Sequence, residues 1–151
     1  MDFHCPDRHD YPRLIELWES AVRATHHFLP EPYLLRLKGL LLDQYLDTVT
    51  LFCTRDDQGL ITGFAGVSLG KLQMLFVGAH YHGQGLGTHL LNHAIEHFGI
   101  HELDVNEQNP QALAFYLRHG FRQSSRSPVD GLGQPYPMLR LTLKPDRLAR
   151  S

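Results

Sequence analysis

The chain has 151 residues, of which 42% are hydrophobic and 20% charged, and its formal net charge is −2. This composition predicts one soluble globular domain over residues 1–151, with a polar tail at 145–151, and the charge offers no basic surface for nucleic acid. No apolar run approaches the ~20 residues that a membrane helix needs, and Cys5 and Cys53 form no C-x-x-C pair. We therefore expect a cytoplasmic protein without nucleic-acid or membrane partners.

The first half of the chain is predicted to contain an edge strand, two helices and a β-hairpin. Residues 1–6 are typical of a short edge strand, and Asp7 is a suitable N-cap for the helix that follows. A second, leucine-rich helix begins at Glu31. From Val49 the apolar period becomes two, and turn residues at 56–59 separate two strands. The buried face of the first helix is expected to consist of Leu14, Leu17, Trp18, Ala21 and Val22.

The second half alternates strands and helices without a linker or repeat. A helix is expected after Gly87, with Gly99 as its stop, and another after Asn109, which is an N-cap followed by proline. A loop rich in proline and glycine fills residues 127–137. The expected strands are 72–77, 101–105, 121–126 and 139–143. This order predicts a single α/β domain.

Three alternating glycines, Gly83, Gly85 and Gly87, lie between an apolar strand and an amphipathic helix. Glycine lets backbone N–H groups converge on a ligand, and a helix N-terminus favours a phosphate by about 0.3–1 kcal/mol at an exposed site. The spacing excludes a dinucleotide-binding G-x-G-x-x-G, because Thr88 stands where the third glycine would fall. The segment is therefore a candidate phosphate loop, with a purely structural turn as the alternative.

A second motif supports the first. Residues 109–121 read N-x-x-A-x-x-x-Y-x-x-x-G-F, with Asn109 as helix cap and Tyr116 on the apolar face. This motif resembles the second signature of the GCN5-related N-acetyltransferases (GNAT). The loop resembles their Q/R-x-x-G-x-G, except that His82 replaces the usual Arg or Gln. Further likeness to the bacterial YjaB-type acetyltransferases covers nearly the whole chain and is clearest at 25–29, 105–109 and 130–137.

The resemblance implies the acyl-CoA N-acyltransferase fold, a mixed α/β sheet with about four helices, whose fourth and fifth strands splay apart to admit acetyl-CoA. The co-substrate would be acetyl-CoA, and no metal is implied. Carried over by position, the cofactor-binding residues would be Leu75, Phe76 and Val77 along the pantetheine arm, His82, Gly83, Gln84, Gly85, Leu86, Gly87 and Thr88 at the pyrophosphate, and Asn109 at the pantetheine.

The resemblance also places Tyr116 near the sulfur. A phenol with an ordinary pKa near ~10 stays protonated at neutral pH and can donate to a thiolate whose conjugate acid has a pKa near ~8.5. The general base is less defined. Asp104 occupies the position of a glutamate in related ribosomal-protein acetyltransferases, and His26 titrates near neutrality. Proton loss through a chain of water molecules would require neither residue.

The histidines of the glycine loop and of the helix after it could have a binding role. His82 could contact the diphosphate, in which case acetyl-CoA affinity should rise as the pH falls through its pKa, or it could simply face solvent. His89, His93 and His97 recur every four residues along one helix, but no carboxylate or cysteine completes a ligand set at a recognised spacing. We therefore expect no native metal site.

The leading function is direct acetyl transfer from acetyl-CoA to a primary amine of a small molecule or of a peptide or protein, by a monomer or homodimer. The alternative is a non-catalytic acyl-CoA-binding domain that acts as a sensor or an assembly unit. Acceptor contacts are expected from the first two helices, around Trp18, His26 and Phe28, and from the 127–137 loop with Asp130 and Tyr136.

Overall fold

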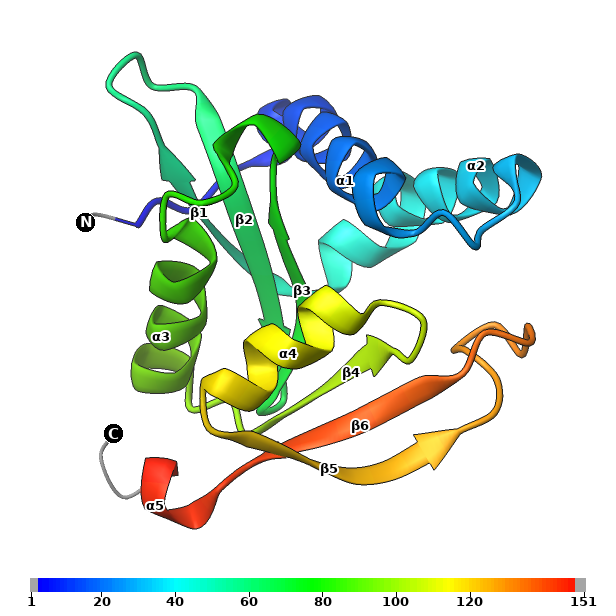
Figure 1. Ribbon diagram of the computed structural model, residues 1–151. Helices are drawn as coiled ribbons and strands as arrows, with labels where there is room; N and C mark the ends of the chain where they lie inside the picture. The colour runs from blue at the N-terminus through cyan, green and yellow to red at the C-terminus, as the bar shows by residue number, and fades with distance from the viewer. Residues whose placement is uncertain (1–2, 149–151) are drawn as a thin grey trace.

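The computed structural model, which describes residues 3–148, contains a mixed sheet of six strands in the order β1-β2-β3-β4-β6-β5. Helices cover both faces of the sheet (Figure 1). The strands are β1 (Thr50–Arg55), β2 (Ile61–Ser68), β3 (Lys71–Val77), β4 (Glu102–Asn106), β5 (Phe121–Ser127) and β6 (Met138–Leu143). The α-helices are α1 (Tyr11–Thr25), α2 (Glu31–Leu40), α3 (Leu86–Phe98), α4 (Pro110–Arg118) and α5 (Pro145–Leu148). The predicted α/β class with a splayed mixed sheet is confirmed.

Two hydrophobic clusters sandwich the sheet. One lies beneath α1 and α2 and includes Trp18 and Phe64, and the other lies beneath α3 and α4 and includes Leu90 and Phe121. In β1, Leu51 and Cys53 enter one cluster and Phe52 enters the other, so residues 51–54 of this strand are all buried. The helices thus bury both faces of β2, whose residues 61–67 are all buried, so this strand lacks the polar alternation of a half-exposed one.

The N-terminal prediction is correct for the helix and wrong for the strand. The Asp7 side chain accepts from the His9 N–H at 2.9 Å and begins a 3₁₀ turn that continues into α1. The five residues predicted to form the buried face of α1 are all buried. Of the predicted strand, only His4 pairs with Cys53. Pro6 has no N–H for a longer ladder, and Met1 and Asp2 lie outside the described residues.

The C-terminal segment expected to be a polar tail begins with a short helix. Residues 145–148 form the short helix α5, and residues 149–151 lie outside the described part. The Arg147 side chain lies over Gly120, where an added Cβ would approach its Cγ to 3.1 Å. Its Nη2 also donates to Asn92 Oδ1 at 2.5 Å. Gly120 has φ +94°, so both its backbone conformation and this contact favour glycine.

Strands β3 and β4 part soon after they meet. Their parallel pairing consists of Lys71 with Glu102 and Leu72 with Leu103. Beyond Leu72, β3 continues to pair with β2 only, while β4 pairs with β6 up to Asn106. Backbone groups on the facing edges of residues 73–77 and 104–106 therefore have no neighbouring strand. The predicted splay is confirmed, because β3 and β4 are the fourth and fifth strands when the expected edge strand at residues 1–6 is counted as the first. The splay opens the sheet beside α4.

Replacement of a core residue of α3 tests this packing. Leu90 is fully buried, so Leu90→Ala should lower the free energy of unfolding by about 2–5 kcal/mol, measured by chemical denaturation. The matched control is Leu35→Ala on α2, where the leucine is 49% exposed and the loss should stay within about 0.5 kcal/mol. Equal losses in the two variants would contradict the described core.

Candidate active site

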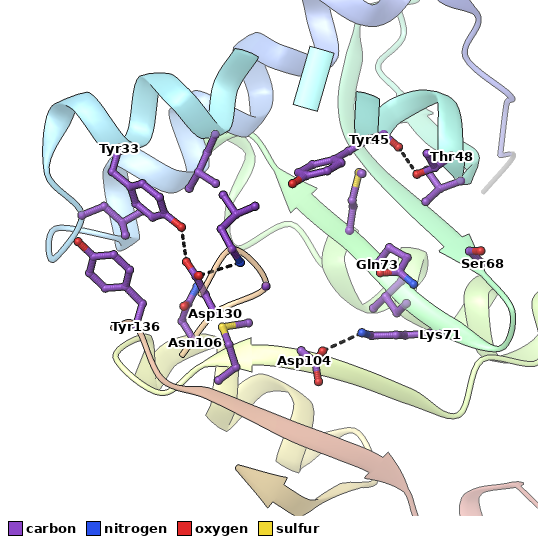
Figure 2. Close-up of a pocket in the computed structure, with 18 residues that line it drawn as sticks. Tyr33, Tyr45, Thr48, Ser68, Lys71, Gln73, Asp104, Asn106, Asp130 and Tyr136 are labelled. Carbon is purple, nitrogen blue, oxygen red and sulfur yellow. Dashed lines mark hydrogen bonds and ion pairs between the residues drawn. The ribbon is translucent and has the colours of Figure 1, made fainter. Parts of the chain in front are cut away.

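Three adjoining cavities form a path through the sheet where β3 and β4 part. The glycine-loop cavity has about 440 Å³ and lies between α1, β3, the glycine loop and α4. The gap cavity, of about 130 Å³, lies between β3 and β4. The tyrosine cavity, of about 560 Å³, is bounded by α2, β3, β4 and the 127–137 loop (Figure 2). His26 and Tyr116 line the first two cavities, and Asp104 lines the last two.

The glycine loop has the backbone of an anion-binding turn. Gly83 and Gly85 have φ of +84° and +78°, a region that other residues rarely adopt, and Gly85 is the N-cap of α3. No described side chain caps this helix, so its first N–H groups remain open to a ligand. The predicted cofactor residues that line the cavity are Leu75, Phe76, Val77, His82, Gly83, Gly85, Leu86, Gly87, Thr88 and Asn109. Gln84 does not line it.

His82 lines this cavity, but its ring is engaged with β3. Its Nε2 lies 2.9 Å from the carbonyl oxygen of Val77. A carbonyl only accepts, so the His82 Nε2–H donates. The imidazole thus connects the glycine loop to the last residue of β3, at the end of the splayed edge.

Sequence reasoning missed two features of the glycine-loop cavity. Among the residues that the structure describes, Arg118 is the only lysine or arginine that lines the cavity, no carboxylate lines it, and Arg118 forms no ion pair. His119 also supports the loop, because its Nε2 lies 3.0 Å from Thr88 Oγ1 while its Nδ1 lies 2.7 Å from the Phe115 carbonyl oxygen. The sequence signal that could have predicted Arg118 is its position in the second motif, two residues after Tyr116.

Helix α4 brings Asn109 and Tyr116 to the gap. The Asn109 Oδ1 accepts from the Ala112 N–H at 3.2 Å, as predicted for a cap. The amide nitrogen of Asn109 remains available to donate a hydrogen bond to a ligand. Tyr116 is 9% exposed, and burial raises the pKa of its phenol above the ordinary value. Its hydroxyl is therefore a proton donor at neutral pH, and it bonds to no other side chain in the described chain. Leu117, the next residue of α4, is 45% exposed.

Asp104 is held by two cations. Its carboxylate accepts from Lys71 Nζ at 2.7 Å, and from Arg140 Nε at 2.7 Å and Nη2 at 3.2 Å (Figure 2 shows Lys71). Burial raises the pKa of Asp104, but hydrogen bonds from Arg140 and Lys71 outweigh burial and hold this pKa below its ordinary value. The geometry is that of an ion-paired carboxylate with little tendency to accept a proton at neutral pH.

His26 follows the last residue of α1 and is half-buried beside the gap. Burial lowers the pKa of its imidazole, the neighbouring His27 lowers it further, and a hydrogen bond with the Val22 backbone opposes part of that shift. The ring is therefore neutral at pH 7 and above. It lies 5.3 Å, between ring centroids, from Phe28. The structure thus brings two of the three predicted catalytic residues, His26 and Tyr116, to the same two cavities.

The tyrosine cavity contains part of the predicted acceptor region. Tyr33 donates to Asp130 and stacks on Tyr136 at 5.2 Å between ring centroids (Figure 2). The same Asp130 carboxylate accepts the N–H groups of Leu132 and Gln134 at 2.9 Å each, so it organises its own loop. Trp18, also predicted to contact the acceptor, is 6% exposed and belongs to the core beneath α1 and α2, because its face of the helix packs on the sheet.

The histidine-rich helix has a packing role at one position. His93 stacks on Phe3 at 4.0 Å between ring centroids, and it also contacts Phe52. Among residues 3–148, no three His, Cys, Asp or Glu side chains lie close enough together to hold a metal ion. No helix of this described part has both the length and the apolar run that a membrane span requires.

Comparison with known proteins identifies the class. A family model described as the acetyltransferase (GNAT) domain matches residues 41–138, well over half of the chain. The chain therefore belongs to the GNAT family of acetyltransferases. It is an N-acetyltransferase that uses acetyl-CoA to acetylate an amine, and the predicted family, fold and activity are confirmed.

The relatives are bacterial. Peptidyl-lysine N-acetyltransferase YjaB of Salmonella typhimurium is 39% identical over 129 residues, which cover 85% of this chain and 88% of the relative. YjaB of Escherichia coli is 36% identical over 128 residues, covering 85% and 86%. The solution structure of apo YjaB from E. coli matches with a TM-score of 0.86 at 32% identity, over 94% and 96% of the two chains.

A more distant structure shares the fold alone. The PaiA N-acetyltransferase of Thermoplasma acidophilum, solved in complex with coenzyme A, matches with a TM-score of 0.71 at 19% identity, over 92% of this chain and 96% of that one. The shared fold extends over nearly the full length of both chains.

The ion pairs of Asp104 make its contribution to stability depend on pH. The pKa of Asp104 is lowered in the folded protein, so its stabilisation is present above the ordinary pKa of about 3.9 and is lost as the pH falls through the lower folded value. Asp104→Asn should cost about 1–3 kcal/mol of unfolding free energy at pH 7. The difference from wild type should shrink between about pH 5 and pH 2. A difference that stays constant with pH would contradict the ion pairs.

Proposed function

We propose that this enzyme transfers the acetyl group of acetyl-CoA directly to the ε-amine of lysine side chains in peptides or proteins, in the bacterial cytoplasm. The observation that carries the proposal is the path through the sheet, because it offers the donor and the acceptor separate cavities joined by the gap cavity, which Tyr116 and His26 line. The acceptor class is supported by the relatives named peptidyl-lysine N-acetyltransferases at 36–39% identity.

Acetyl-CoA fits the glycine-loop side of the path. The amides of residues 83–88 and the start of α3 suit the pyrophosphate, and Arg118 supplies a positive charge that His82 does not supply in neutral form. The open edge of β3 suits the amide-containing pantetheine arm, which would add to the sheet as a strand does. The free amide nitrogen of Asn109 donates to the same arm.

His82 acts on β3 rather than on the pyrophosphate in this proposal. Its Nε2–H is directed to the Val77 carbonyl, which keeps the loop against the strand that receives the pantetheine. The N–H that His82 donates to Val77 is then not available to the pyrophosphate.

The transfer needs one proton acceptor and one proton donor. A neutral lysine amine from the tyrosine cavity attacks the thioester carbonyl, the C–S bond breaks, and Tyr116 protonates the departing thiolate. His26, which is neutral at pH 7, takes the proton that the amine loses. Asp104 is not used as a base, because Lys71 and Arg140 hold it as a carboxylate.

Lysine as acceptor also agrees with the charges around the tyrosine cavity. Its two carboxylates, Asp104 and Asp130, are already bound by cations, by Tyr33 or by backbone N–H groups. A polyamine with several positive charges therefore finds no free carboxylate among the residues that line this cavity. The stacked rings of Tyr33 and Tyr136 suit the aliphatic stem of a lysine side chain.

The role of Tyr116 can be tested by removing its hydroxyl. Tyr116→Phe should lower kcat about 10²- to 10⁴-fold, because a positioned general acid is lost, while the Kd for acetyl-CoA measured by calorimetry stays within about twofold. The matched control is Tyr11→Phe, whose hydroxyl bonds to Asp47 on the surface and whose kcat should equal that of wild type. Full turnover of Tyr116→Phe would remove this residue from the mechanism.

The acceptor class can be tested by thiol release and mass spectrometry. The substrates are N-terminally blocked peptides with a single lysine, the same peptides with arginine in its place, and spermidine. We expect acetylation at the lysine ε-amine, none of the arginine peptides, and a kcat/KM for spermidine about tenfold or more below that for the lysine peptides. Efficient acetylation of spermidine alone would replace the proposed acceptor with a small polyamine.

A further inference from the structure

Thr25, the last residue of α1, has no part in the proposed chemistry but contacts a residue that does. Its Oγ1 lies 2.8 Å from the carbonyl oxygen of Ala21, one turn earlier in the helix. The same oxygen lies 2.7 Å from His26 Nδ1. Thr25 is half-buried and lines the glycine-loop cavity together with His26. One hydroxyl thus connects the helix backbone to the imidazole.

The number of protons decides the direction of both hydrogen bonds. A threonine hydroxyl has one proton, and a carbonyl oxygen can only accept. The Thr25 hydroxyl therefore donates to Ala21, and its lone pair accepts from His26. His26 must then carry its proton on Nδ1, which leaves Nε2 with a free lone pair. No hydrogen bond from the described residues occupies that Nε2.

We propose that Thr25 is a positioning residue, which holds His26 in the Nδ1–H tautomer so that Nε2 accepts the proton of the acceptor amine. The inference rests on the proposed function of His26 as base and deepens it. In the other tautomer, Nε2 would carry a proton and could not accept one, so the ring would be present in the site without being able to act. A carbonyl or carboxylate that fixes the tautomer of a catalytic histidine serves the same purpose in other enzymes.

Aromatic contacts restrict the same ring from another direction. Phe28 lies 5.3 Å from His26 and 5.9 Å from Tyr136, between ring centroids. Tyr136 stacks in turn on Tyr33, at the wall of the tyrosine cavity. These contacts limit the orientation of the imidazole, but they cannot choose between its two nitrogens, because stacking does not depend on which nitrogen carries the proton. That choice falls to the groups that hydrogen-bond to the ring, which are the Thr25 hydroxyl at Nδ1 and the Val22 backbone.

The titratable groups around His26 leave the Nδ1–H tautomer available. His27 is its neighbour in the chain, Tyr116 faces the same two cavities from α4, and Asp104 faces the gap from β4. His82 and Arg118 also line the glycine-loop cavity. Asp104 is bound by Lys71 and Arg140, so no free carboxylate from these elements competes with Thr25 for the imidazole N–H.

Nuclear magnetic resonance can read the tautomer without any substrate. In protein labelled with ¹⁵N-histidine, His26→Gln identifies the signals of His26. In wild type and in Thr25→Ser at pH 8, Nδ1 should show the shift of a protonated nitrogen and Nε2 that of an unprotonated one. In Thr25→Val, which keeps the shape and removes the hydroxyl, the population should move toward Nε2–H. A wild-type ring protonated on Nε2, or an unchanged tautomer in Thr25→Val, would overturn the inference.

Kinetics then test whether the tautomer matters. Thr25→Val should lower kcat/KM for a lysine peptide about 5- to 10-fold, the factor that one ordinary hydrogen bond is worth, with the KM for acetyl-CoA unchanged. Thr25→Ser should restore the activity. Thr142→Val, which removes an exposed hydroxyl on β6 bonded to Ser124, is the remote control and should equal wild type.

A double variant separates positioning from a structural effect. If Thr25 acts only through His26, adding Thr25→Val to His26→Gln should lower kcat/KM no further. A further 5- to 10-fold loss in the double variant would overturn the inference. Failure of the proposed acceptor would appear differently, as a wild-type enzyme that acetylates no lysine peptide, while the ¹⁵N spectra would still decide the role of Thr25 in fixing the tautomer.

Discussion

The site depends on the short pairing between β3 and β4. Two strands that stayed paired to their ends would satisfy each other's N–H and C=O groups and close the sheet. Here the pairing ends after Leu72 and Leu103, while each strand keeps its other neighbour. The sheet therefore retains its rigidity on both sides of an opening, and the opening presents backbone groups that only a ligand or solvent can satisfy. The two helical layers keep the separated strands in place because each packs on one face of the sheet.

Charge differs between the two ends of the path in the way that the proposed donor and acceptor require. The glycine-loop end has a helix N-terminus, open backbone N–H groups and one arginine, without a carboxylate among its lining residues. The tyrosine end has carboxylates, but each is already bound by its own partners. The first end suits an anionic donor, and the second admits an amine without fixing it as an ammonium ion. That balance matters because only the neutral amine is a nucleophile.

Burial gives the two proposed catalytic groups opposite protonation states from the same physical cause. Removing a group from water disfavours its charged form. The pKa of Tyr116 is therefore raised, so its phenol keeps its proton, while the pKa of His26 is lowered, so its imidazole stays neutral. The gap is thus lined by the proposed acid and the proposed base, each in the protonation state that its role needs. Asp104 shows the opposite outcome, because its cationic partners outweigh the effect of burial.

Much of this protein follows from local sequence. The order and type of the main helices and strands, the Asn109 cap and the glycine conformations could be predicted, because apolar period, capping chemistry and positive φ are local properties. The sequence also determined the class, since two motifs at the right separation identify the family. Local sequence did not show that, of residues 3–6, only His4 forms a bridge, or that residues 145–148 form a helix.

Tertiary structure alone decided the state of the site residues. The sequence could name Asp104 and His26 as candidates. No local signal shows that Lys71 and Arg140 lie beside Asp104, or that His26 is half-buried in the gap. Trp18 lies on α1, and His26 directly follows the last residue of this helix. Trp18 packs in the core, whereas His26 lines the cavities. Protonation and exposure depend on residues distant in the chain, so they are determined only when the sheet brings those residues together.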